Sequence, residues 1–147
     1  MRIREILLPA SVLLLAALLA ACDSDPEAAP DLLFLVKKPV EGERIVMDAL
    51  YEGSVVESEG CLRFGDEPER HTVVWPPGFS LTNVDGSYVV LDERGRTVGQ
   101  IGRFFRFGGG EVETLWEDGP VAETARVEAL RRCPGRYWIV GEVPGSE

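Results

Sequence analysis

Short apolar stretches alternate with turn-forming and charged residues over most of the chain after position 31. The clearest pattern is an alternation of apolar and more polar positions from Ile45 to Tyr51, which is typical of a half-buried strand. Similar stretches predict further strands at 55–56, 61–64, 72–75, 87–91, 96–101, 104–107, 112–116 and 137–140. Residues 32–36 predict either a first strand or a packing segment; a less favoured alternative is a patch that touches the membrane surface. The pattern therefore predicts a chain that is mainly β.

Turn residues indicate where these strands bend, reverse or end. Gly53-Ser54 interrupts the first long strand and predicts a bulge or a bend there. The segment from Asp92 to Gly95 predicts a hairpin, because aspartate and glycine supply the positive φ angles that a chain reversal needs. The run of three glycines at 108–110 predicts the end of the aromatic strand 104–107.

One segment, Val121 to Arg132, has the features of a helix. Pro120 suits its first turn, and Glu123 suits its positive N-terminal end. Several short strands with one short late helix predict a small closed barrel or a sandwich. A barrel is favoured because closure leaves no exposed strand edge. The order of elements loosely resembles an OB-fold, in which the helix normally falls in the middle of the sheet.

The first 21 residues have a different pattern. Arg2 and Arg4 precede a nearly unbroken apolar run, and two alanines follow it, which is the arrangement of a signal peptide. The sequence Leu19-Ala20-Ala21-Cys22 resembles the lipobox of bacterial lipoproteins, whose cysteine receives a diacylglyceryl group before a peptidase cleaves in front of it. The resemblance implies that Cys22 is lipidated and becomes the first residue of the mature protein.

Two other interpretations of this N-terminal segment fit less well. A transmembrane helix needs about 20 apolar residues, whereas the uncharged run from Ile6 to Ala21 is shorter and contains Pro9. Secretion without a lipid would leave the cysteine directly after Leu-Ala-Ala unexplained. We therefore expect residues 1–21 to be a lipoprotein signal peptide.

The expected lipid anchor defines the organisation of the rest of the chain. Residues 22–31 are acidic and contain two prolines, so they predict a lipidated flexible tether. Residues 32–147 predict a single β-rich domain on the extracytoplasmic face of the cell membrane. The net charge of −10 disfavours nucleic acid as a partner. The expected partners are the membrane, through Cys22, and a protein, peptide or glycan.

Several stretches of the expected domain resemble small bacterial lipoproteins for which no activity is established. These stretches are Gly60-Cys61-Leu62, Val74 to Phe79, Gly108-Gly109-Gly110, and Cys133 together with Tyr137 to Gly141. The likeness covers most of the mature chain. It implies no activity, no cofactor and no catalytic residue.

Cys61 and Cys133 are the two cysteines that remain once Cys22 carries a lipid. On the oxidising side of a membrane, an even pair of this kind predicts a disulfide bond. The alternative is a reactive thiol pair, but the pair lacks the Cys-x-x-Cys spacing that lowers the pKa of a thiol. We therefore predict a structural disulfide between Cys61 and Cys133.

His71 is the only histidine of the chain, and it limits the catalytic and metal-binding options. A structural zinc site needs about four ligands, which one histidine and two distant cysteines do not supply. The acidic loop 66–69 and the turn 83–86 lack EF-hand spacing, and the chain has no Gly-x-Ser-x-Gly nucleophile motif. We expect no metal, no cofactor and no catalytic residue, and we expect His71 to face solvent at a strand end.

Two stretches are candidate binding surfaces. The first consists of Trp75, Pro76, Pro77 and Phe79. Its prolines hold two aromatic side chains on a loop, where binding residues often lie; alternatively, Trp75 and Phe79 plug one end of the barrel. The second alternates arginines with phenylalanines, and its candidates are Arg103 and Phe105. It suits an acidic protein segment or an anionic glycan; alternatively, its arginines point outward and its phenylalanines point into the core.

These features favour a lipid-anchored, non-catalytic binding protein or component of the cell envelope. One alternative is a binding module for peptidoglycan fragments, peptides or small molecules. Another is a hydrolase that works through two carboxylates, as many glycosidases do, since the chain holds 25 aspartate and glutamate residues.

Overall fold

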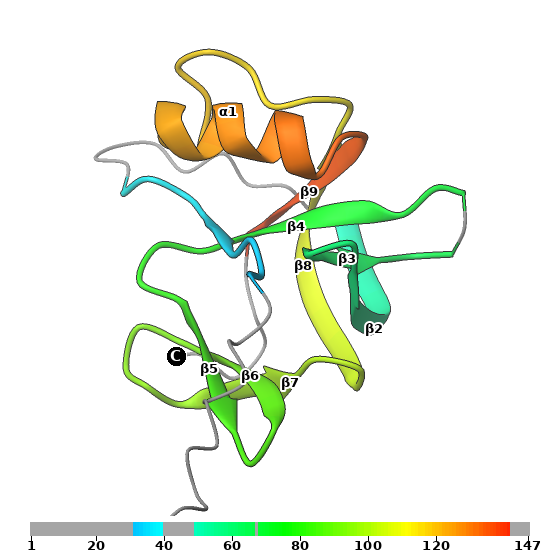
Figure 1. The fold of residues 1–147 in the computed structure, drawn as a ribbon, viewed down its shortest axis with the longest axis vertical. Helices are drawn as coiled ribbons and strands as arrows, with labels where there is room; N and C mark the ends of the chain where they lie inside the picture. Colours follow the sequence, from blue (N-terminus) through cyan, green and yellow to red (C-terminus); the bar gives the residue numbers. More distant parts are fainter. Residues whose placement is uncertain (1–30, 40–48, 67, 142–147) are drawn as a thin grey trace, which may run out of the picture.

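The computed structural model of the chain describes residues 31–39, 49–66 and 68–141. Within these ranges it contains nine strands and one helix (Figure 1). In chain order they are β1 (Leu35–Val36), β2 (Ala49–Ser58), β3 (Cys61–Phe64), β4 (His71–Trp75), β5 (Ser80–Val84), β6 (Ser87–Leu91), β7 (Thr97–Gln100), β8 (Phe104–Val112), α1 (Glu123–Arg132) and β9 (Arg136–Val140). The expected signal peptide, Cys22 and the start of the predicted strand at Ile45 lie outside the described residues.

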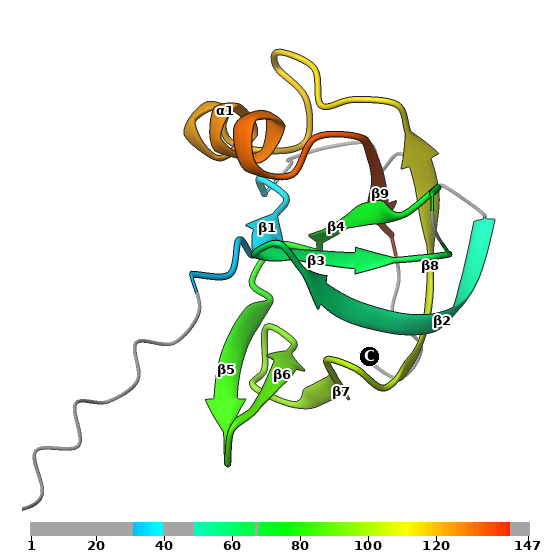
Figure 2. The same cartoon turned by 45° about the vertical axis from the view of Figure 1, so that its right-hand side comes forward.

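Five strands form a closed barrel, which confirms the prediction of a mainly β barrel with one short late helix. Their order around the barrel is β4, β3, β2, β8 and β9, and β9 closes the ring by pairing with β4. That pairing is parallel, whereas the other four pairings around the ring are antiparallel. The short strand β1 adds to the end of β4 in parallel. Figure 2 shows the barrel strands curving around a common interior.

Strands β5, β6 and β7 form a second, antiparallel sheet at the end of the molecule opposite α1 (Figure 1). The predicted hairpin around Asp92 to Gly95 is confirmed, because β6 and β7 pair across this turn. Strand β5 was not predicted, since its side chains are exposed or only half-buried and its sequence is mostly polar. Asp85 and Gly86, with φ angles of 51° and 79°, connect it to β6.

Two groups of buried apolar side chains stabilise the fold. The larger group fills the barrel and extends to the small sheet; it consists of Val55, Leu62, Phe64, Val73, Trp75, Val90, Phe105, Phe107, Trp138 and Val140. The smaller group lies between the barrel and α1; it consists of Leu35, Val74, Leu115, Val121, Ala129, Tyr137 and Ile139. Successive residues of β9 therefore belong to different groups, as Tyr137 and Trp138 illustrate.

The predicted end of the aromatic strand at the three glycines 108–110 is wrong. Strand β8 continues through all three of them to Val112, and residues 113–116, which we expected to belong to a strand, follow in a loop. At the glycines, β8 changes its partner from β2 to β9. A Cβ atom on Gly109 would collide with the carbonyl oxygen of Ile139. Glycine therefore permits a close approach of two strands here and does not end one.

Strand β2 passes through Gly53-Ser54 without a bulge, because its register with β8 is unbroken over residues 49–54. After Ser54 the strand changes its partner from β8 to β3. Figure 2 shows that β2 is strongly curved, so the predicted bend is present and the predicted bulge is not. Gly53 also leaves space for Tyr51, whose ring would overlap a Cβ atom at position 53.

The predicted helix and the predicted disulfide are both confirmed. Helix α1 ends at Arg132, and Cys133 follows directly. Cys133 is bonded to Cys61 at the start of β3, with a Cα–Cα distance of 5.9 Å, and both cysteines are fully buried. In the described part of the chain, no helix has the length and apolar character needed to cross a membrane.

Candidate functional site

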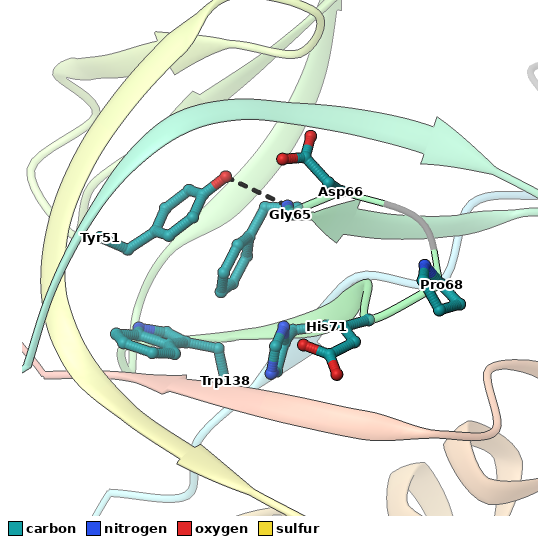
Figure 3. A pocket seen from close by; sticks show the side chains of 8 residues that line it. Tyr51, Gly65, Asp66, Pro68, His71 and Trp138 are labelled. Carbon is teal, nitrogen blue, oxygen red and sulfur yellow. Dashed lines mark hydrogen bonds between the residues drawn. The ribbon is translucent and has the colours of Figure 1, made fainter.

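A hollow of about 340 Å³ lies at the barrel, and four barrel strands and one loop contribute to it. Its lining residues are Tyr51, Phe64, Gly65, Asp66, Pro68, Glu69, His71 and Trp138. Figure 3 shows Tyr51, Gly65 and Asp66 on one side of the hollow, and Trp138 and His71 on the other. Residues 65, 66, 68 and 69, which lie between β3 and β4, therefore line the hollow together with aromatic rings that the strands supply.

The rings form a compact aromatic cluster. Phe64 lies between Tyr51 and His71, with ring centroids 3.8 Å from Tyr51 and 5.3 Å from the nearly parallel imidazole of His71. The indole of Trp138 meets the edge of this stack, at 5.4 Å from Phe64 and with an interplanar angle of 84°. Each ring comes from a different barrel strand, so closure of the barrel brings them together.

His71 is buried, with 9% of its surface exposed, so our expectation that it faces solvent is wrong. Its Nε2 lies 2.8 Å from Oε2 of Glu111, a residue of β8. Because an ionised carboxylate only accepts hydrogen bonds, Nε2 donates, and the lone pair of the neutral ring lies on Nδ1. Nδ1 is buried and has no hydrogen-bond partner. The imidazole thus has one nitrogen fixed by Glu111 and one nitrogen unpaired.

Glu111 is itself held by a second set of ion pairs. Its Oε1 lies 3.1 Å from a guanidinium nitrogen of Arg136, and Nε of Arg136 lies 3.4 Å from Oε2 of Glu113. The carboxylate that binds His71 is therefore fixed from behind by Arg136. This arrangement holds the imidazole ring in one orientation.

The rim of the hollow is acidic. Asp66 and Glu69 are exposed, and within the described part of the chain no lysine or arginine lines the hollow. Gly65 N–H donates to the hydroxyl of Tyr51 on β2 at 3.1 Å, and next to it Glu69 N–H donates to the Asp66 carbonyl at 2.9 Å. The hollow therefore combines aromatic walls with negative charge at its mouth.

The Trp75 loop has the structure of a core segment. Trp75 is fully buried, and its ring stacks with that of Phe79 at 6.4 Å and packs against that of Phe105 at 5.8 Å. Pro76 and Pro77 are half-buried beside it. Trp75 and Phe79 thus plug the barrel, which was the alternative interpretation, and the buried side chain of Trp75 is not available to a ligand at the surface.

The second predicted binding surface also contributes a side chain to the core. Phe105 is 3% exposed and belongs to the core, whereas Arg103 is exposed in the turn before β8. Neither residue lines the hollow, and the residues of the Trp75 loop do not line it either. The structure therefore brings Trp75, Phe79 and Phe105 together in the core, and leaves Arg103 at the surface.

Sequence reasoning missed most of the residues around the hollow. His71 was noted as the sole histidine, but its partner Glu111 is 40 positions away and follows no motif. In the sequence, Tyr51, Phe64 and Trp138 have the pattern of ordinary core residues on three different strands. The described residues contain no group of three or more histidine, cysteine, aspartate or glutamate side chains arranged to hold a metal ion.

Comparison with known proteins gave no match to a family model, to a curated protein or to a solved structure. The site itself offers an aromatic surface, one buried and unpaired imidazole nitrogen, and two carboxylates at the rim.

Proposed function

We propose that this protein is an exported lipoprotein, held on the extracytoplasmic face of the cell membrane by a lipid on Cys22. In this proposal its barrel domain is a non-catalytic binding component of the cell envelope. The proposal is carried by one observation, namely which of the three cysteines are bonded and which is left over. Cys61 and Cys133 are bonded to each other, which leaves Cys22 as the single remaining cysteine, directly after the apolar run.

Two physical arguments support this assignment. Disulfide bonds persist in oxidising compartments, so the Cys61–Cys133 bond agrees with export. A single acyl chain gives only marginal membrane binding, whereas a diacylglyceryl group supplies the two chains that stable attachment needs. The acidic surface expected from the net charge of −10 would itself add no attraction to anionic headgroups. The lipid would therefore carry the membrane attachment.

The hollow, and not the Trp75 loop, supports a binding role best. Its volume of about 340 Å³ lies at the lower end of the range for small-molecule sites. Aromatic walls with a few polar groups are typical of such sites. We therefore propose that the ligand of this domain binds in this hollow.

The lipid can be tested by expressing the full chain in a bacterium fed an alkyne-bearing fatty acid. We expect the label on the wild-type chain and its loss in Cys22→Ser, because the serine hydroxyl does not replace the thiol in lipidation. The matched control is Cys61→Ala/Cys133→Ala, which keeps Cys22 and should retain the label. An unlabelled wild-type chain, or a labelled Cys22→Ser chain, would contradict the proposal.

A further inference from the structure

We infer that the hollow lined by Tyr51, His71 and Trp138 binds a primary ammonium group, such as that of an alkylamine or a lysine side chain. This inference deepens the proposed binding role and rests on it. It does not depend on the lipid, so an experiment can contradict the ammonium site without contradicting the lipid on Cys22, and the reverse. Three features of the hollow carry it: an unpaired acceptor, two rim carboxylates and a cluster of aromatic rings.

The unpaired acceptor is Nδ1 of His71. The residue is 9% exposed, and Nδ1 itself has no hydrogen-bond partner. Glu111 accepts from Nε2 at 2.8 Å, so in the neutral ring the lone pair lies on Nδ1. Figure 3 shows the ring standing in the wall of the hollow below Gly65, and a Cβ atom at Gly65 would lie 3.7 Å from Nδ1. A buried acceptor without a partner is costly, so a ligand that donates a hydrogen bond there would be favoured.

The charge around the hollow selects a cation. Asp66 and Glu69 carry negative charge at its rim, and the eight described residues that line the hollow include no lysine or arginine. The nearby guanidinium of Arg136 is already paired with Glu111 and Glu113. An anionic ligand would meet the rim carboxylates as like charges, which disfavours it.

The aromatic rings favour the same class of ligand. Tyr51 and Trp138 contribute their side chains to the lining, and a cation near the face of such a ring is attracted by its quadrupole. A neutral apolar ligand would fill the volume but leave Nδ1 of His71 unpaired. A primary ammonium offers three N–H donors, enough to pair Nδ1 and a carboxylate together.

The test uses His71 as a reporter, because the chain has no other histidine. The untagged full chain is purified in neutral detergent, and the imidazole C–H resonances are followed by NMR while n-butylamine is added. A pH of about 8.5 keeps an ordinary imidazole neutral and an alkylamine protonated. We expect a saturable shift of the His71 resonances. Equal concentrations of 1-butanol and butyrate, which match the probe in length, should produce none.

A pair of variants separates local recognition from overall charge. Asp66→Asn/Glu69→Gln should weaken n-butylamine binding at least about tenfold, and the exposed positions of both residues keep the core intact. The matched control, Glu117→Gln/Asp118→Asn, removes the same charge from exposed positions outside the lining and should change the affinity by less than about twofold. Equal weakening by both pairs would overturn the inference.

Two further arms complete the design. Tetramethylammonium has the charge of the probe without its N–H donors, so we expect weaker binding; equal affinity would overturn the role of Nδ1. Nα-acetyl-lysine methylamide is then compared with n-butylamine. Tighter binding of the lysine derivative supports a peptide as the source of the ammonium, and equal binding supports a free amine. No His71 shift with either amine, or an equal shift with butyrate, would overturn the inference and leave the lipid assignment untouched.

Discussion

Asp92 is a buried carboxylate that organises the turn between β6 and β7. Its Oδ1 accepts hydrogen bonds from the backbone N–H groups of Arg94 and Arg96, at 2.9 and 2.8 Å, and its Oδ2 accepts from Nε of Arg96 at 2.7 Å. Burial by itself raises the pKa of the Asp92 carboxyl, but the hydrogen bonds from Arg96 and Arg94 outweigh it, so the pKa is lowered. The charged form of Asp92 is therefore favoured in the folded protein.

Replacing this carboxylate tests its role through pH. Asp92→Asn should lower the thermal midpoint at neutral pH, because the turn loses charge-assisted hydrogen bonds. A lowered folded pKa contributes stability that is present above the ordinary aspartate pKa of about 3.9 and is lost as the pH falls through the folded value. The midpoints of the two proteins should therefore converge below about pH 4. Circular dichroism melts at stepped pH would measure this.

The control for Asp92 is Asp85→Asn, which changes an exposed residue in the other hairpin of the same sheet. Asparagine tolerates the positive φ angle of this position. We expect its melting temperature to follow that of the wild-type protein at every pH. A midpoint difference for Asp92→Asn that stays constant below pH 4 would contradict the electrostatic explanation.

At the scale of elements, the glycines of β8 decide how the barrel closes. Gly109 pairs with Ala49 on β2 and with Val140 on β9, so three strands meet at this position. A Cβ atom there would lie 2.5 Å from Nε1 of Trp138 and would collide with the Ile139 carbonyl. Backbone atoms cannot move aside without breaking the pairing of β8 and β9. A side chain at position 109 is therefore incompatible with the observed closure.

Gly109→Ala should destabilise the protein by about 3 kcal/mol, at the upper end of the usual cost of overpacking. Urea unfolding followed by tryptophan fluorescence would measure the loss. Gly102→Ala is the matched control, because a Cβ atom there meets nothing within 4 Å, although its φ angle of 84° still disfavours alanine. We expect the control to cost about 1–2 kcal/mol. Equal losses for the two variants would show that close strand approach is not the cause.

At the scale of the whole molecule, the disulfide joins the barrel to the helix. Cys61 begins β3 and Cys133 follows α1, and the two are separated by 72 positions in the sequence. The hydroxyl of Tyr137 donates to the Cys133 carbonyl at 2.8 Å, which ties β9 to the same corner. Arg132 pairs with Asp31 at 3.2 Å, so the last residue of the expected tether also lies at this corner.

Breaking this bond should cost about 4 kcal/mol in the chain-entropy model for a loop of this length. We expect a reducing agent to lower the urea midpoint of the wild-type protein. Cys61→Ala/Cys133→Ala should start from a lower midpoint and should not respond to the reducing agent. A wild-type midpoint that is unchanged after complete reduction, confirmed by thiol mass labelling, would contradict a stabilising role.

Local patterns predicted much of the fold, and their errors have a common cause. Side-chain periodicity predicted the strands around Val73 and Trp138 and the helix, and turn-forming residues predicted the turn at Gly95. The number of cysteines in the chain predicted the disulfide partners. The three glycines were interpreted as a strand end because glycine usually interrupts strands. In this barrel they instead let β8 approach β9 closely at Gly109. That contact involves a residue 30 positions away, which no local pattern contains.

The sequence by itself determined the conformations that depend on neighbouring residues: mainly β structure, one late helix and the positions of most turns. It also predicted an exported, lipidated chain, which remains a proposal. Only the tertiary structure decided which side chains meet. His71 contacts Glu111, and Phe64 lies between Tyr51 and His71, because closure of the barrel brings together strands that are far apart in the chain. The hollow exists through this closure, since pairing between distant strands is a property of the whole sheet and not of any segment.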